Sequence, residues 1–278
     1  MNEQSNFDIP TEQTEKVIIV SEEELKKEKS RSILAIIFYL ATLFVAASFI
    51  AYAIGYILCQ KYELDMLTFV EGLAATDFTE YDPMYLKVSA LCQGWANLLS
   101  YLIGAVAVCI ILYKALIIDF KKIKERPLYF LAYVAICGIA FLVITTVAGI
   151  LLGFIIDDSV NQATIEMIMT NGGAPTMIVS VVLLAPILEE LVYRKAIFNL
   201  LRKYGKPACY AVSIILFTLP HMISTDMSNM LIWLIQCVPY ALSGFLLCYI
   251  YDRSNENIYT SIAVHMLNNI LACILIFV

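Results

Sequence analysis

Two adjacent carboxylates and an arginine lie in an apolar stretch that is long enough to cross a bilayer. Glu189, Glu190 and Arg194 all fall within the predominantly apolar segment 176–201. On insertion scales, each ionisable group at membrane depth costs roughly 2.5–3.5 kcal/mol. Three such groups within six residues therefore indicate that these side chains serve a function.

The chain contains two histidines, and both lie in apolar segments as well. His221 falls within 208–225 and His265 within 258–277, where Asn269 follows it. A single histidine or asparagine in a membrane helix is more often a packing or hydrogen-bonding residue than a catalytic one. Two imidazoles, a carboxylate and an amide from three different segments are together typical of a site.

Helical spacing assigns provisional partners within the acidic segment. Glu190 and Arg194 are four residues apart, so they share a helix face and can form an ion pair. Glu189 is rotated by about 100° from Glu190 and can point elsewhere. Glu189 is therefore the carboxylate that is left for chemistry.

The same spacing organises the two histidine segments. His265 and Asn269 share one face of the last segment, which would present an imidazole and an amide side by side. Phe217 and His221 also share a face, so the phenyl ring can pack against the imidazole and orient it.

The elements that must position these residues are membrane-spanning helices. The 278-residue chain is 61% hydrophobic and 15% charged, with a mean hydropathy of +0.80, whereas a soluble domain is about 45–50% apolar and about 25% charged. The sequence therefore predicts an all-α, polytopic transmembrane bundle of about seven spans, each near the length of about 20 residues that a bilayer requires. The predicted spans are 33–59, 88–118, 128–156, 176–201, 208–225, 229–251 and 258–277.

Basic residues fall in alternate connections between these spans. They precede the first span, join the second to the third and the fourth to the fifth, and follow the sixth: Lys26, Lys27, Lys29, Arg31, Lys121, Lys122, Lys124, Arg126, Arg202, Lys203, Lys206 and Arg253. The positive-inside rule then predicts a cytosolic N-terminus. We expect residues 1–31 to be a disordered cytosolic tail and 32–278 to be the transmembrane domain, in the plasma membrane if the protein is bacterial.

Cysteine usage and net charge exclude other kinds of site. The eight cysteines are scattered singly along apolar segments without a CxxC pair, which predicts reduced, small apolar residues rather than disulfides or a cysteine metal site. The net charge of -6 provides no basic patch for nucleic acid, so we expect a lipid bilayer and no nucleic acid as partner.

Three motifs on the late spans resemble the CPBP family of intramembrane proteases. This family includes the CAAX-prenyl endopeptidases and the bacterial bacteriocin-processing and immunity proteins of the Abi group. The resemblance covers about residues 175–270, which we take as the catalytic core. The motifs Glu-Glu-x-x-x-Arg, Phe-x-x-x-His and His-x-x-x-Asn are complete in Glu189, Glu190 and Arg194, in Phe217 and His221, and in His265 and Asn269.

The resemblance implies hydrolysis of a peptide bond in a membrane-associated protein or peptide. In the family mechanism, residues at the positions of Glu189 and His221 activate a water, and those at His265 and Asn269 stabilise the oxyanion. The remaining motif residues would support the site structurally. General chemistry agrees, because a carboxylate removed from water is a stronger base and N–H groups suit an oxyanion. The family also suggests a role in bacteriocin processing or self-immunity.

A metal and two other function classes are open alternatives. Family names include metalloprotease, and Glu189, His221 and His265 could hold zinc with an open position for water. The sequence lacks HExxH, which favours metal-free glutamate catalysis. A proton- or cation-coupled transporter is a second reading, although no inverted repeat is evident. The third is a catalytically silent immunity or scaffold protein on this fold.

Overall fold

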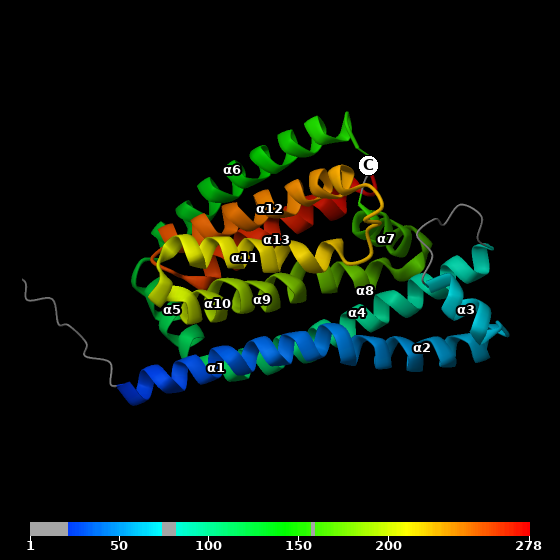
Figure 1. The fold of residues 1–278 in the computed structure, drawn as a ribbon, viewed down its shortest axis with the longest axis horizontal. Helices are drawn as coiled ribbons and strands as arrows, with labels where there is room; N and C mark the ends of the chain where they lie inside the picture. The colour runs from blue at the N-terminus through cyan, green and yellow to red at the C-terminus, as the bar shows by residue number, and fades with distance from the viewer. Residues whose placement is uncertain (1–21, 74–81, 157–158) are drawn as a thin grey trace, which may run out of the picture.

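The computed structural model describes residues 22–73, 82–156 and 159–278, and this part of the chain forms helices without any strand. Six helical stretches in it are long and apolar enough to cross a membrane. They run side by side as one bundle (Figure 1), so the predicted all-α, multi-pass membrane architecture is confirmed. The six stretches are Glu22–Tyr62, Pro83–Ile111, Pro127–Gly153, Val160–Tyr204, Met230–Arg253 and Ile258–Leu275.

The remaining predicted span, 208–225, is a shorter helix inside the same bundle. It is α11 (Lys206–Met222), which has 17 residues and begins with Pro207 in its first turn. Proline is tolerated there because the first N–H groups of a helix have no intrahelical acceptor. At 1.5 Å per residue α11 is about 26 Å long, slightly less than the hydrocarbon core of a typical bilayer. It packs along α12 (Met230–Arg253).

The first span is one continuous helical stretch. It consists of α1 (Glu22–Ala41), the π-helical turn η1 (Thr42–Ala46) and α2 (Ala47–Tyr62). Of the predicted N-terminal tail, residues 1–21 lie outside the described residues, and 22–31 form the first turns of α1. The connection after this span contains the short helix α3 (Met66–Leu73).

The second span ends earlier than predicted. α4 (Pro83–Ile111) stops at Leu112, whose backbone departs from helical geometry, and α5 (Tyr113–Glu125) continues as a separate helix. α5 mixes apolar residues with lysines and Asp119, and its apolar residues extend the hydropathy signal past the end of the span. α6 (Pro127–Gly153) follows, with Pro127 at its start.

The acidic motif lies in the middle of an irregular helical stretch. α7 (Val160–Ile168) continues into η2 (Met169–Gly173). η2 contains a break at Asn171 and Gly172, where Gly172 takes a φ of +99° that glycine adopts without steric strain. The stretch then continues through α8 (Ala174–Ile178), η3 (Val179–Leu184), α9 (Ala185–Glu190), η4 (Leu191–Ala196), α10 (Ile197–Leu201) and η5 (Arg202–Tyr204). The wider π-helical turns η3 and η4 therefore flank α9 on both sides. Such turns are frequent at functional sites.

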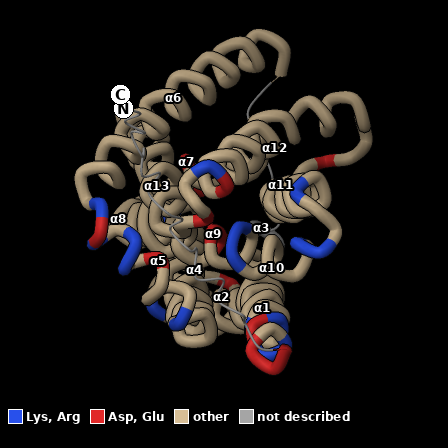
Figure 2. The backbone as a smooth tube through the Cα atoms, turned by 90° about the vertical axis from the view of Figure 1, so that its left-hand side faces the viewer, with Lys and Arg blue, Asp and Glu red and all other residues tan. Residues whose placement is uncertain are grey.

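The basic connections meet at one end of the bundle. Figure 2 shows this end, where lysine, arginine and acidic residues gather around α1, α5 and α10. Ion pairs join the connections there, between Lys206 and Asp252 at 2.7 Å and between Arg202 and Glu256. We call this the basic end. The last helix, α13 (Ile258–Leu275), begins there.

Asp119 is the anchor of the basic end. Its carboxylate is buried and accepts hydrogen bonds from Lys122 at 2.8 Å, from Lys195 at 2.6 Å and from the backbone N–H of Ile258 at 3.2 Å. Asn257 donates to its backbone oxygen at 3.1 Å. One residue of α5 thereby holds η4 and the start of α13 together.

We predict that Asp119→Ala lowers the free energy of unfolding by about 1–3 kcal/mol, because three donors lose their buried acceptor. Equilibrium unfolding of the purified protein in detergent micelles would measure this change. Glu23→Ala is the control, since the Glu23–Lys27 pair on α1 is highly exposed and such pairs contribute little. Equal stability of the two variants would contradict the anchoring role.

Candidate active site

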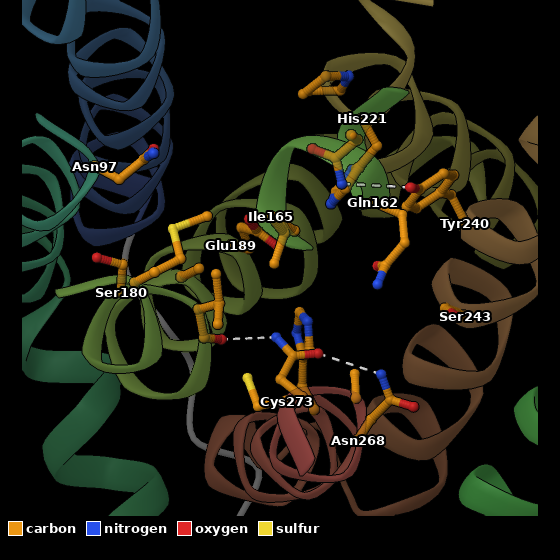
Figure 3. A pocket seen from close by; sticks show the side chains of 18 of the residues that line it. Asn97, Gln162, Ile165, Ser180, Glu189, His221, Tyr240, Ser243, Asn268 and Cys273 are labelled. Carbon is orange, nitrogen blue, oxygen red and sulfur yellow. Dashed lines mark hydrogen bonds between the residues drawn. The ribbon is translucent and has the colours of Figure 1, made fainter. Parts of the chain in front are cut away.

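A cavity of about 420 Å³ lies within the bundle, and all four predicted catalytic residues line it. Glu189 reaches it from α9, His221 from α11, and His265 and Asn269 from α13. Figure 3 shows Glu189 and His221 around this space together with residues of α7, α12 and α13. The structure thus brings together groups that are up to 80 residues apart, Glu189 and Asn269.

Glu189 is buried and has one long hydrogen bond. Its side chain is 4% exposed, and the Tyr101 hydroxyl of α4 donates to its Oε1 at 3.5 Å. The described residues Glu189 and His221 line the same cavity without a direct hydrogen bond to each other. Because a carboxylate can accept about four hydrogen bonds, Glu189 keeps the capacity to bind a water in the cavity.

His221 is oriented by its own helix and by two rings. Its Nδ1 lies 2.8 Å from the backbone oxygen of Phe217. A carbonyl only accepts, so Nδ1 carries the proton and Nε2 of the neutral ring is an acceptor. The imidazole stacks on Tyr240 at a centroid distance of 4.6 Å and packs on Phe217 at 5.0 Å. The predicted contact between Phe217 and His221 is therefore present.

Glu190 forms the predicted ion pair with Arg194 and also holds a residue of another helix. Its Oε1 lies 3.1 Å from the Arg194 guanidinium and 3.0 Å from Nδ1 of His265. Arg194 donates further to the backbone oxygen of Gly244 in α12 at 3.2 Å, and its guanidinium lies 4.6 Å above the Phe217 ring. Glu190 and Arg194 are completely buried, so this cluster fixes the orientation of His265.

Asn269 replaces a missing helical hydrogen bond in the acidic stretch. At the end of η3, the backbone N–H of Ala185 donates to the backbone oxygen of Ser180, five residues earlier. The next hydrogen bond with this spacing would run from the N–H of residue 186 to the backbone oxygen of Val181. Pro186 has no N–H. The Asn269 amide donates to the Val181 oxygen instead, at 2.7 Å, and thereby joins α13 to η3.

The other end of the Asn269 amide is also held. Asn268 donates to its Oδ1 at 3.2 Å and accepts from the Thr145 hydroxyl at 3.3 Å. The amide nitrogen has two protons, of which Val181 takes one. Asn269 is thus a fixed donor on the wall of the cavity.

Several side chains of the site were not predicted from the sequence. Tyr101 contacts Glu189, Tyr240 stacks on His221, and Asn268 orients Asn269. Asn268 was visible as a second intramembrane amide beside Asn269. The two tyrosines gave no signal, because the chain contains 17 tyrosines and neither belongs to one of the three motifs.

The described residues do not form a metal-binding cluster. Among them, no three histidine, cysteine, aspartate or glutamate side chains are close enough to hold a metal ion together. Glu189, His221 and His265 line one cavity but are not gathered as a ligand set. The arrangement therefore does not fit the zinc alternative.

Comparison with known proteins identifies the segment that carries the site. Residues 171–271 match the family model described as type II CAAX prenyl endopeptidase Rce1-like. This range closely matches the 175–270 expected from the three motifs, and it confirms the resemblance. No curated protein and no solved structure gave a significant match.

We predict strong energetic coupling between Glu190 and Arg194. Glu190→Gln or Arg194→Met alone should each lower the free energy of unfolding by about 3–5 kcal/mol, because each leaves an uncompensated buried charge. The double variant should lose less than the sum of the two single losses. A double-mutant cycle in detergent micelles measures the coupling. The exposed pair Glu22–Lys26 of α1 is the control, and additive losses at Glu190 and Arg194 would contradict the prediction.

Proposed function

We propose that this membrane protein hydrolyses a peptide bond with Glu189 and His221. Residues 171–271 match the family model described as type II CAAX prenyl endopeptidase Rce1-like. The family supports a CAAX-type membrane protease in general. The observation that carries the residue assignment is the convergence of all four predicted groups on one cavity. The proposed substrate is a membrane-associated protein or peptide, and bacteriocin processing or self-immunity are the proposed biological roles.

Glu189 and His221 are suited to activate a water molecule. Both side chains line the cavity and can accept a hydrogen bond there. Glu189 has only the long contact with Tyr101, and Nε2 of His221 has no proton in the neutral ring. A water held between them loses a proton to one of the two as it attacks the carbonyl carbon. The same group then returns the proton to the leaving amine when the carbon–nitrogen bond breaks.

His265 and Asn269 are suited to stabilise the oxyanion. Nδ1 of His265 donates to Glu190, so Nε2 of His265 can donate a hydrogen bond only when the ring is protonated. The proposed contact with the oxyanion therefore requires the protonated imidazole. Glu190 Oε1 accepts the Nδ1 hydrogen bond of that form at 3.0 Å. The second amide proton of Asn269 supplies another hydrogen-bond donor. His265 and Asn269 are both fixed in position by other residues before the reaction, as electrostatic stabilisation of an oxyanion requires.

We predict that Glu189→Gln and His221→Ala each reduce the rate of cleavage by about 10²–10⁴-fold, the range expected for loss of a general base. The measurement uses the purified protein in proteoliposomes with a pool of membrane-anchored peptides, followed by mass spectrometry. Glu125→Gln is the matched control, because Glu125 is exposed at the end of α5.

Cleavage by both variants at the rate of the unsubstituted chain would contradict the assignment. Absence of cleavage by the unsubstituted chain, combined with proton uptake that depends on Glu189, would instead favour the transporter alternative.

We predict that Asn269→Ala lowers kcat by about 10²–10³-fold, the loss typical of one oxyanion donor. KM should change little, because the interaction forms only in the transition state. Asn268→Ala should cause a smaller loss of kcat, since it only orients Asn269. Asn199→Ala, at the basic end where Asn199 donates to Ser32, should retain full activity. A rise in KM at constant kcat would assign Asn269 to substrate binding instead.

A further inference from the structure

We propose that the cavity opens at the non-cytosolic face of the membrane and receives peptide segments that are presented there. The chemistry of cleavage rests on the function proposed above, whereas the direction of the opening rests on separate observations. The first observations are the position of the cavity along the helices and the helix α7 at its rim. The others are the packed layer between the cavity and the basic end, and the charge of the basic end.

The cavity occupies the half of the bundle that lies away from the basic end. α13 begins at the basic end with Ile258, and its lining residues run from His265 to Ile276 beyond its last turn. α11 also begins near the basic end, at Lys206, and it lines the cavity only near its other end, through Phe217, Pro220 and His221. Two neighbouring helices therefore place the cavity toward the same end.

α7 forms the rim of the cavity at that end. It lies at the end of the bundle opposite α5 (Figure 1), and Asn161, Gln162 and Ile165 contribute to the lining. The hydroxyls of Ser159 and Tyr240 are 2.6 Å apart, and Asn161 donates to the same Tyr240 hydroxyl at 3.3 Å. Because Tyr240 stacks on His221, the rim lies directly beside the proposed catalytic imidazole.

A buried layer separates the cavity from the basic end. The Glu190–Arg194 pair is completely buried, and the hydroxyls of Tyr39 and Tyr193 bind each other at 2.7 Å beside it. Buried apolar side chains fill the space from this pair to the Asp119 anchor: Leu191, Val192, Ala196, Ile197, Phe198, Ile250, Tyr251 and Ile258. A substrate that approaches from the basic end meets this layer before it reaches Glu189.

Charge fixes which face of the membrane each end contacts. The connections at the basic end carry most of the lysines and arginines, whereas the connection 157–175, which contains α7, has none. The positive-inside rule places the basic end in the cytosol. The rim then faces away from the cytosol, so the substrates would be exported peptides or the outer segments of membrane proteins, and not cytosolic C-termini.

The orientation is tested first by labelling exposed cysteines with a membrane-impermeant maleimide. Thr170→Cys lies beside the rim and Lys124→Cys at the basic end, and both positions are exposed. In intact cells we expect labelling at position 170, with labelling at position 124 only after permeabilisation. The unsubstituted chain controls for reaction of native cysteines. The reverse pattern would overturn the inference, whatever the substrate is.

The direction of substrate entry is tested with two matched libraries of single-span reporters in cells. Each reporter carries a short variable segment next to the membrane, on the outer face in one library and on the cytosolic face in the other. We expect cleavage only of the outer library, and none by the Glu189→Ala variant. Cleavage of the cytosolic library would overturn the inference and leave the protease function intact. Cleavage of neither library would contradict the protease function, and the labelling result would still decide the orientation.

Discussion

The buried carboxylate of Glu190 connects the four helical segments on which the site depends. It lies on α9 and binds Arg194 in η4 and His265 in α13, while Arg194 in turn reaches Gly244 in α12 and the Phe217 ring in α11. A completely buried arginine in a membrane helix requires such compensation, because an unpaired charge there is strongly destabilising. The same contacts that satisfy the charge also set the relative positions of the helices that carry His221 and His265.

The site uses a second general constraint, that every backbone polar group in a membrane protein needs a partner within the protein. Pro186 removes one N–H from the π-helical register, and Asn269 satisfies the Val181 oxygen in its place. A local defect in one helix thereby fixes the amide of another. Glu189 differs from its neighbours because its one hydrogen bond, from Tyr101, is long. Glu190 Oε1, by contrast, lies at 3.1 Å and 3.0 Å from Arg194 and His265, so Glu189 is the carboxylate that keeps capacity for a ligand.

The sequence predicted the parts of this arrangement that depend on local spacing. The pairing of Glu190 with Arg194 and the contact of Phe217 with His221 both follow from residues four apart on one helix, and the hydropathy pattern located the spans. The contact of His265 with Glu190 and the stacking of Tyr240 on His221 join residues 75 and 19 positions apart. They depend on how the helices pack, which single-helix periodicity does not contain. The break at Leu112 was missed because amphipathic α5 extends the apolar signal.

Hydrolysis inside a membrane requires water at the site without a continuous aqueous path across the bundle. The two ends of this protein are built in different ways, which agrees with the proposed hydrolysis. At the basic end, Asp119 and the ion pairs of the connections hold the helices together around a tightly packed apolar layer. At the other end, the packing is interrupted by the break at Gly172 and by the cavity below α7. His221 and Glu189 both line this cavity, so in the proposed mechanism the attacking water would come from the cavity side.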